Sequence, residues 1–193
     1  MPRHREFDPD DVLRVAVDLF WEKGYKGSSV AEIVKRSGVA KYGIYSSLGG
    51  KDEIFWKVLK QYSLDRAKDL QLPLRRKGAS IREIFEFFEG IAELTTGDIK
   101  TPGCLSVKVG LELGSHDTKV SDFVAKFFED IARLFEVCLK TARKNGELDE
   151  SLNIPVLATY IATELRTVLM LAGSGHSCND LKNHLKFALR ALR

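Results

Sequence analysis

Amine, phenol and hydroxyl side chains gather between residues 28 and 51, in a stretch that is poor in carboxylates. From Ile33 to Lys51 every charged residue is basic, although the whole chain carries 30 Lys and Arg against 27 Asp and Glu. Ammonium and guanidinium groups bind phosphates, and phenol and hydroxyl groups hydrogen-bond the edges of bases. This composition therefore favours a nucleic-acid-binding surface. The alternative is a basic face that is merely solvated.

Two short helices joined by a glycine turn must position these side chains. Ser29 and Glu32 have the S-x-x-E spacing of a capping box, which satisfies free backbone N–H groups at a helix start. The apolar residues that follow form one stripe, and Gly38 predicts the helix end, because glycine adopts the left-handed conformation without steric cost.

The second helix is expected over 41–48 and carries most of the polar groups. Ile44 and Leu48 are its apolar anchors, and the remaining side chains are left for solvent or a partner. Such a helix fills a core poorly and suits the major groove of DNA. A third helix is expected to start near Lys51.

The chain resembles the TetR family of bacterial transcriptional regulators over its N-terminal quarter. The matching residues are Asp11-Val12-Leu13, Ala16, Leu19-Phe20, Gly24-Tyr25, Ser28 to Ile33, Gly38-Val39-Ala40, Gly43-Ile44-Tyr45 and Gly50 to Phe55. The resemblance implies an all-α fold, with a three-helix helix-turn-helix domain in residues 1–50 and a helical effector-binding and dimerisation domain in residues 51–193. Ala40 departs from the family's Ser or Thr, so the recognition helix is expected to lack a side-chain cap.

The resemblance also implies a palindromic double-stranded DNA operator as partner and a repressor as the commonest role. The expected DNA-contacting residues are Ser28, Ser29, Lys41, Tyr42, Tyr45, Ser46, Ser47 and Lys51. We expect Lys41 to reach guanine and Tyr42 a base or thymine methyl group. Ser28, Ser29, Tyr45 and Lys51 are expected to hold phosphates.

Composition and length indicate a folded, cytoplasmic protein. The 193 residues are 44% hydrophobic, enough to bury a sizeable core. The charged N-terminus Met1 to Arg5 lacks the apolar run of a signal peptide, and no uninterrupted apolar stretch of membrane-spanning length is apparent, so no membrane partner is expected. Three cysteines without a C-x-x-C pair argue against a disulfide framework.

The rest of the chain shows helical periodicity and no alternating strand pattern. Pro155 suits the first turn of a penultimate helix that is apolar around much of its circumference. The resemblance implies a homodimer through the last two helices. A charge at an outward apolar position of the last helix, for which Leu185 is the example, is then expected to yield monomers.

The resemblance implies a small-molecule effector bound within the C-terminal helices. The expected ligand-binding residues are Phe85, Phe88, Cys104, Phe127, Phe128, Tyr160, Glu164, Arg166 and Met170, with Thr163 as a further polar candidate. Each aromatic residue has an alternative as ordinary core. The alternative for Glu164 and Arg166 is an interhelical or interface salt bridge.

Gly103-Cys104-Leu105 resembles a G-C-L motif of a TetR subgroup in which some members sense oxidants or electrophiles through cysteine. Cys104 near a helix start is thus a candidate redox sensor, and the alternative is a buried small hydrophobe. His176, Cys178 and His184 match no standard metal-ligand spacing, so neither a metal nor a cofactor is expected.

No catalytic residues are expected, so an enzyme is the weaker alternative. Ser115-His116-Asp117 contains the residue types of a hydrolytic triad, but immediate neighbours point in different directions. The chain has no G-x-S-x-G, phosphate-binding glycine loop or H-E-x-x-H motif. A DNA-packaging protein would share the basic helix, but it would not need the large aromatic-rich C-terminal region.

Overall fold

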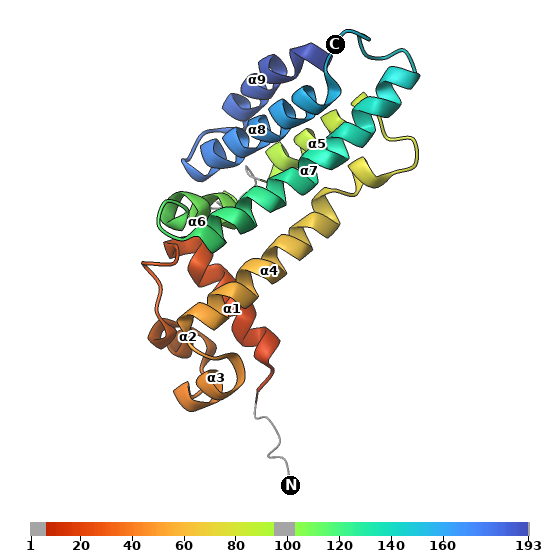
Figure 1. Cartoon of the computed structure of the whole chain (residues 1–193). Helices are drawn as coiled ribbons and strands as arrows, with labels where there is room; N and C mark the ends of the chain where they lie inside the picture. The colour runs from red at the N-terminus through yellow and green to blue at the C-terminus, as the bar shows by residue number, and fades with distance from the viewer. Residues whose placement is uncertain (1–6, 95–102, 193) are drawn as a thin grey trace. The chain divides into compact units, whose positions relative to one another are not determined.

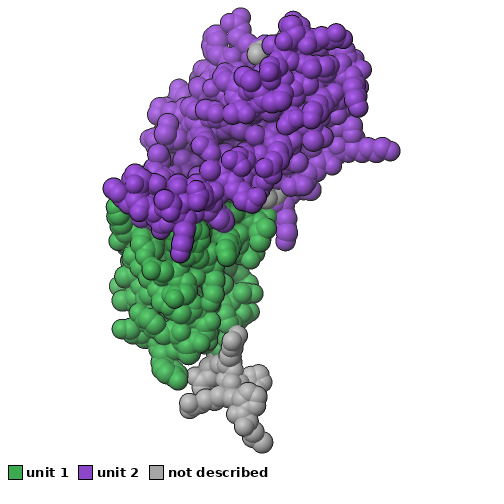
Figure 2. All heavy atoms as spheres, viewed as in Figure 1, with its two compact units in different colours: residues 1–65 green, residues 66–193 purple. Residues whose placement is uncertain are grey.

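The computed structural model describes residues 7–94 and 103–192, and every regular element within them is a helix, which confirms the all-α prediction. The chain divides into two compact units, residues 1–65 and residues 66–193, coloured separately in Figure 2. The division falls inside α4, a continuous helix from Lys51 to Leu70.

The first unit contains α1 (Pro9–Lys23), α2 (Val30–Ser37), α3 (Lys41–Leu48) and the first part of α4 (Figure 1). α1 packs against both α2 and α3. The Phe20 ring meets the Phe55 ring edge-on, with their centroids 5.5 Å apart. The buried side chains that hold this unit together include Val12, Ala16, Leu19, Phe20, Ile33, Ile44, Leu48, Ile54 and Phe55.

The second unit contains the remaining helices. Their bounds are Pro73–Arg75 (η1), Ile81–Leu94 (α5), Leu105–Leu113 (α6), Thr118–Lys144 (α7), Ile154–Gly173 (α8), Cys178–Ala188 (α9) and Leu189–Leu192 (η2). α7, α8 and α9 lie side by side in Figure 1, and the most extensive contact is between α7 and α8. α5 packs against α7 and α9, while α6 contacts α7 and α8.

The helix starts follow local sequence signals. Asp117 caps α7, since its Oδ1 accepts a hydrogen bond from Lys119 N at 2.9 Å. Pro155 lies in the first turn of α8 behind the cap Asn153, as the sequence predicted. Because Asp117 is engaged at a helix cap, the Ser115-His116-Asp117 sequence acts in the fold as a helix start.

Three phenylalanine rings form the centre of the second unit. Phe88 stacks on Phe135 at 5.9 Å, and Phe87 meets Phe135 edge-on at 5.5 Å. Leu185 belongs to the same core and is only 7% exposed, so the prediction that it faces outward was wrong. α9 turns this residue toward α5 and α8, and its exposed apolar side chain is Phe187 instead.

α8 is long and apolar enough to cross a membrane when judged by length and composition alone. Within the unit it packs against α6, α7 and α9, and it carries Glu164 and Arg166. Both features are typical of a core helix in a globular domain.

Gly103 packs directly against the end of α8, which gives the Gly103-Cys104-Leu105 motif a structural explanation. Its φ is +77°, and a Cβ there would lie 2.8 Å from the Cα of Gly173 and 2.9 Å from the carbonyl oxygen of Leu169. Gly103→Ala is therefore expected to lower the free energy of unfolding by about 2 to 3 kcal/mol, through left-handed strain and backbone overlap. Urea unfolding followed by circular dichroism measures this change.

Gly90 provides the matched control. It lies within α5, and a Cβ at this position would meet nothing within 4 Å. Gly90→Ala is expected to raise stability by about 0.5 to 1 kcal/mol, because alanine loses less backbone entropy in a helix. Equal stability of the two alanine variants would contradict the packing role of Gly103.

Candidate nucleic-acid interface and ligand cavity

Local signals fix the geometry of α2 and α3. Ser29 caps α2, and its Oγ accepts a hydrogen bond from Glu32 N at 3.2 Å. Gly38 ends α2 in the left-handed conformation, with φ +70°, as predicted. α3 starts at Ala40 without a side-chain cap, also as predicted, and is anchored by the buried residues Ile44 and Leu48.

The outer face of α3 presents polar and aromatic groups to solvent. Tyr42 is 82% exposed, and Tyr45 is 45% exposed. Lys41 and Ser46 are exposed beside them, and the Lys41 ammonium lies 5.7 Å from the centre of the Tyr45 ring. An amine, two phenols and a hydroxyl thus share one short helix. Such groups can hydrogen-bond base edges and phosphates.

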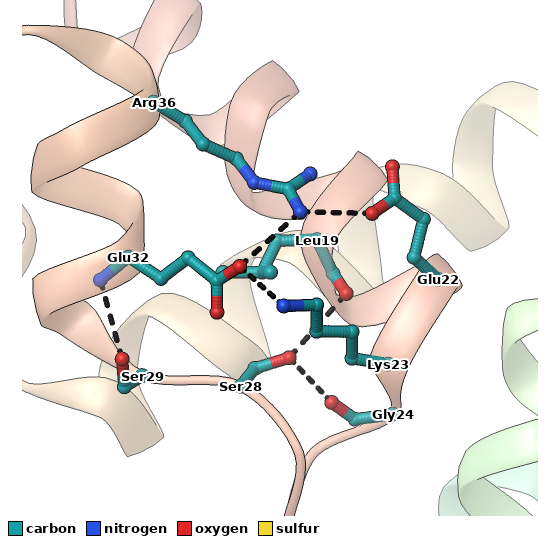
Figure 3. A network of polar contacts seen from close by, with 8 residues as sticks. All are labelled: Leu19, Glu22, Lys23, Gly24, Ser28, Ser29, Glu32 and Arg36. Atoms are coloured by element: carbon teal, nitrogen blue, oxygen red, sulfur yellow. Dashed lines mark hydrogen bonds and ion pairs between the residues drawn. The ribbon is translucent and has the colours of Figure 1, made fainter.

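Ser28 occupies an interior position in the turn before α2. It is buried, and its Oγ donates a hydrogen bond to the Gly24 carbonyl oxygen at 2.6 Å and lies 3.3 Å from that of Leu19 (Figure 3). The hydroxyl therefore ties the turn to the end of α1. Ser29, by contrast, is exposed and uses its oxygen as an acceptor, which leaves its proton available.

A network of carboxylates neutralises Arg36, which changes the charge pattern read from the sequence. Arg36 Nη2 donates to Glu22 Oε2 at 2.9 Å and to Glu32 Oε1 at 3.3 Å, and Lys23 Nζ donates to the same Glu32 oxygen at 2.5 Å (Figure 3). The Arg36 hydrogen bond lowers the pKa of Glu22, and the Lys23 hydrogen bond is the largest cause lowering that of Glu32. The stretch is free of carboxylates along the sequence but not in space.

The amines that remain free for anions are those of Lys35 and Lys41. Both residues are exposed, and neither forms an ion pair within the described parts of the chain. Lys51 is held differently, because its ammonium lies 4.2 Å from the centre of the Tyr25 ring, whose hydroxyl donates to Asp52. A cation over a ring keeps its charge and gains a fixed position.

A cavity of about 400 Å³ lies among α6, α7 and α8 in the second unit. Its walls are mostly apolar, and its polar groups come from α7 and α8. The lining residues are Val107, Gly110, Leu111, Gly114, Ser121, Val124, Ala125, Phe128, Thr163, Arg166, Thr167 and Met170. This volume lies within the range of small-molecule sites.

Arg166 is the cation of this cavity. Its guanidinium lies 4.3 Å from the centre of the Phe128 ring. Desolvation lowers the pKa of Arg166, and the charge of Glu129 opposes that shift. Neither a hydrogen bond nor an ion pair joins this guanidinium to the described residues, so its donors are available to a ligand.

The structure separates the residues that the sequence predicted to bind a ligand. Phe128, Arg166 and Met170 line the α6–α7–α8 cavity, together with Thr163. Phe85 and Phe88 line a second cavity of about 330 Å³ between α5 and α9. The residues that line neither cavity are Cys104, Phe127, Tyr160 and Glu164.

Glu164 and Tyr160 have partners on α9. Glu164 Oε2 lies 2.7 Å from His184 Nε2, so this carboxylate forms the interhelical pair that the sequence left open. Tyr160 donates its hydroxyl proton to the Ala188 carbonyl oxygen at 3.0 Å, and desolvation is the main cause raising its pKa. Both contacts tie α8 to α9.

The cysteines are free thiols. Cys104 precedes α6 and is 7% exposed. Cys138 is fully buried, and desolvation raises its pKa to about 11, which leaves the thiol protonated and inert near neutral pH. Within residues 7–94 and 103–192, no group of three or more His, Cys, Asp or Glu side chains is placed to hold a metal.

Comparison with known proteins agrees with this architecture. The family described as bacterial regulatory proteins, tetR family, matches residues 12–58, and the tetracyclin repressor-like C-terminal domain matches residues 80–183. The chain is 26% identical to the HTH-type transcriptional regulator YezE of Bacillus subtilis, with all of both chains covered. It is 25% identical to the HTH-type transcriptional repressor ComR of Escherichia coli, over 93% of this chain and 86% of that one.

A solved structure shows the same fold. A cysteine-substituted form of the TetR family regulator CifR, in complex with 26-base-pair operator DNA, superimposes with a TM-score of 0.86 at 25% identity, covering 98% of both chains. The two family matches fall on the two parts of the chain that carry the helix-turn-helix and the cavity. The chain therefore belongs to the TetR family of bacterial regulatory proteins and is a DNA-binding transcriptional regulator, not an enzyme.

Proposed function

We propose that this protein is a cytoplasmic repressor that binds a palindromic operator as a homodimer and leaves it when a small effector binds. The observation that carries the proposal is the outer face of α3, where Lys41, Tyr42, Tyr45 and Ser46 are all exposed on a helix with a two-residue buried anchor. A helix that presents most of its side chains outward is suited to a major groove.

The DNA contacts divide into two kinds. Lys41 and Tyr42 read base edges, and the exposed Ser46 lies beside them on α3. Ser47 is half-buried and is the weaker candidate for a DNA contact. Ser29, Tyr45 and Lys51 hold phosphates and set the register of the helix. Ser28 does not contact DNA itself. Its buried hydroxyl fixes the turn that precedes α2 and so positions that helix.

The dimer forms through the outer faces of α8 and α9. Val156 is 64% exposed and Phe187 is 67% exposed, and Tyr160 also presents apolar surface on α8. Exposed apolar side chains of this size on neighbouring helices are typical of a protein–protein interface. A two-fold dimer would place its recognition helices about 34 Å apart, one turn of DNA.

The effector binds in the α6–α7–α8 cavity, which has the volume and the mixed lining of a ligand site. α4 runs continuously from the helix-turn-helix unit into the second unit, so a ligand that favours one arrangement of α4 shifts the dimer away from its DNA-bound spacing. Such coupling is typically worth about 1 to 3 kcal/mol.

Lys51→Ala tests the phosphate role. Each lost phosphate contact makes the negative slope of log affinity against log salt concentration less steep by about 0.9. A dimer loses two contacts, so its slope is expected to become less steep by about 1.8. The weakening should be similar for operator and unrelated DNA, because a phosphate carries no sequence information. A gel-shift titration at several salt concentrations measures both.

Two variants control this test. Lys140→Ala removes the same net charge from α7, where Lys140 pairs with Glu136 at 2.6 Å, and it should leave the slope unchanged. Lys51→Arg keeps a cation over the Tyr25 ring and should restore the slope. An unchanged slope for Lys51→Ala would remove Lys51 from the phosphate contacts.

The alternative to an effector in the cavity is a sensor of oxidants or electrophiles that reacts at Cys104. This alternative goes with membership of the G-C-L subgroup. Its support is weaker, because Cys104 is 7% exposed and reactive thiols are typically accessible. Gly103 beside it has a packing role of its own against α8. Operator release by oxidants that disappears in Cys104→Ser would favour this alternative over the cavity.

A further inference from the structure

The α6–α7–α8 cavity has an asymmetric charge. Arg166 is its one charged side chain, and no carboxylate lines it among the described residues. The other polar groups are the hydroxyls of Ser121, Thr163 and Thr167. An apolar site with one cation favours a ligand that brings the opposite charge.

The hydroxyls are already committed as donors. Ser121 Oγ donates to the Thr118 carbonyl oxygen at 2.9 Å, Thr163 Oγ1 to that of Thr159 at 2.9 Å, and Thr167 Oγ1 to that of Thr163 at 3.2 Å. Each hydroxyl proton points back to its own helix, so these groups offer lone pairs to the cavity. The donors for an anion must therefore come from Arg166.

Arg166 is an exposed residue that is held against a ring and has no hydrogen-bond or ion-pair partner among the described residues. The ring of Phe128, 4.3 Å from the guanidinium, holds the plane of the side chain, and both residues line the cavity. The residue as a whole is exposed, while the atoms packed around its guanidinium partly desolvate it and lower its pKa. A carboxylate gains more from a cation that is held and partly desolvated than from a mobile one in water.

The remaining walls select the body of the ligand. Val107, Val124, Ala125 and Met170 offer aliphatic and thioether surface around the Phe128 ring. Gly110 lets α6 lie close to Val124 of α7, because a Cβ at residue 110 would be only 3.3 Å from a methyl group of Val124. The space accepts a compact apolar or aromatic group next to the cation.

We propose that the α6–α7–α8 cavity binds small organic carboxylates with a compact apolar body, and that Arg166 is the counter-ion that selects the carboxylate. This inference rests on the proposed function in one respect, which is that the ligand of this cavity is the effector. The binding chemistry itself is independent of DNA.

Isothermal titration calorimetry with the full-length protein, in a carboxylate-free buffer near neutral pH, tests the proposal. The probes are hydrocinnamate, its neutral amide and phenylpropylamine, which share one aromatic body and differ in charge. Hydrocinnamate is expected to bind about tenfold or more tightly than the amide, and the amine should bind most weakly.

Four variants separate charge from space. Arg166→Gln should weaken hydrocinnamate binding about tenfold or more and change amide binding by less than about twofold, because only the acid uses the charge. Arg166→Lys should restore part of the preference. Ala125→Leu should weaken acid and amide together by filling the cavity. The matched control is Arg190→Gln, since Arg190 lies 5.5 Å from the Phe187 ring outside this cavity.

Several results would overturn the proposal. They are equal binding of acid and amide, no binding of any probe, and unchanged acid binding in Arg166→Gln. A change in sedimentation of Arg166→Gln with no change in acid binding would identify this arginine as an interface residue for a second copy. Hydrocinnamate that binds through Arg166 without releasing operator DNA would support the carboxylate site and contradict induction through this cavity. The binding proposal and the proposed function can therefore be contradicted separately.

Discussion

Replacing Val156 and Phe187 together by glutamate is expected to turn the dimer into monomers. Both side chains are more than half exposed in the isolated chain, on α8 and α9 respectively. In a two-fold dimer each new carboxylate would be buried twice without a partner, and an uncompensated buried charge costs about 3 to 5 kcal/mol. We expect the dimer dissociation constant to rise at least a hundredfold, as about 3 kcal/mol implies.

The subunit itself should tolerate the change. Val156 lies in the first turn of α8, where a carboxylate interacts favourably with the helix dipole. Val137→Glu is the control, because Val137 is 58% exposed on α7 and should leave the dimer intact. Sedimentation velocity measures the assembly, and circular dichroism the helix content. A folded dimer of the double variant would place the interface elsewhere.

Loss of the dimer should also abolish tight operator binding. A helix-turn-helix dimer gains affinity by binding two half-sites at once, and a monomer binds only one. The glutamates lie in the second unit, so the α3 surface is unaltered in sequence. Operator affinity of the double variant should therefore fall to the level of unrelated DNA in a gel-shift titration, while Val137→Glu keeps wild-type affinity.

Tyr42→Ala is expected to lower operator affinity about 30-fold or more. Tyr42 is 82% exposed on α3, with no packing role to lose. A specific base contact contributes about 1 to 3 kcal/mol, and a dimer loses two of them. Binding to unrelated DNA should change by less than about threefold, because the Lys41 and Lys51 charges remain.

Tyr42→Phe separates the ring from its hydroxyl. If the ring contacts a thymine methyl group, the phenylalanine variant should keep most of the affinity. If the hydroxyl bonds a base edge, it should behave like the alanine variant. Competition binding with operators altered one base pair at a time measures the preference. An equal loss on operator and unrelated DNA in Tyr42→Ala would move Tyr42 from base reading to backbone contact.

Local signals along the chain predict where several helices begin and end. Ser29 caps α2, Gly38 ends it, and Pro155 lies in the first turn of α8, as predicted. These signals work because a cap or a left-handed glycine satisfies backbone groups within four residues of itself. The uncapped start of α3 at Ala40 could be predicted for the same reason.

Where charges and side chains meet depends on how the helices pack together. Arg36 is neutralised by Glu22, fourteen residues away on α1, so a run without carboxylates in sequence did not remain so in space. Leu185 lies on a regular apolar stripe, yet periodicity shows which residues share a face and not which face is covered. Packing against α5 and α8 put it inside.

The ligand residues show the same limit. The sequence placed the aromatic residues in one group, but Phe128 and Arg166 line one cavity while Phe85 and Phe88 line another. Helical spacing fixes the order of side chains around one axis, whereas a cavity is the space left where several helices fail to fill it. Its lining, and the lone cation within it, therefore depend on how α6, α7 and α8 pack together, which no local signal encodes.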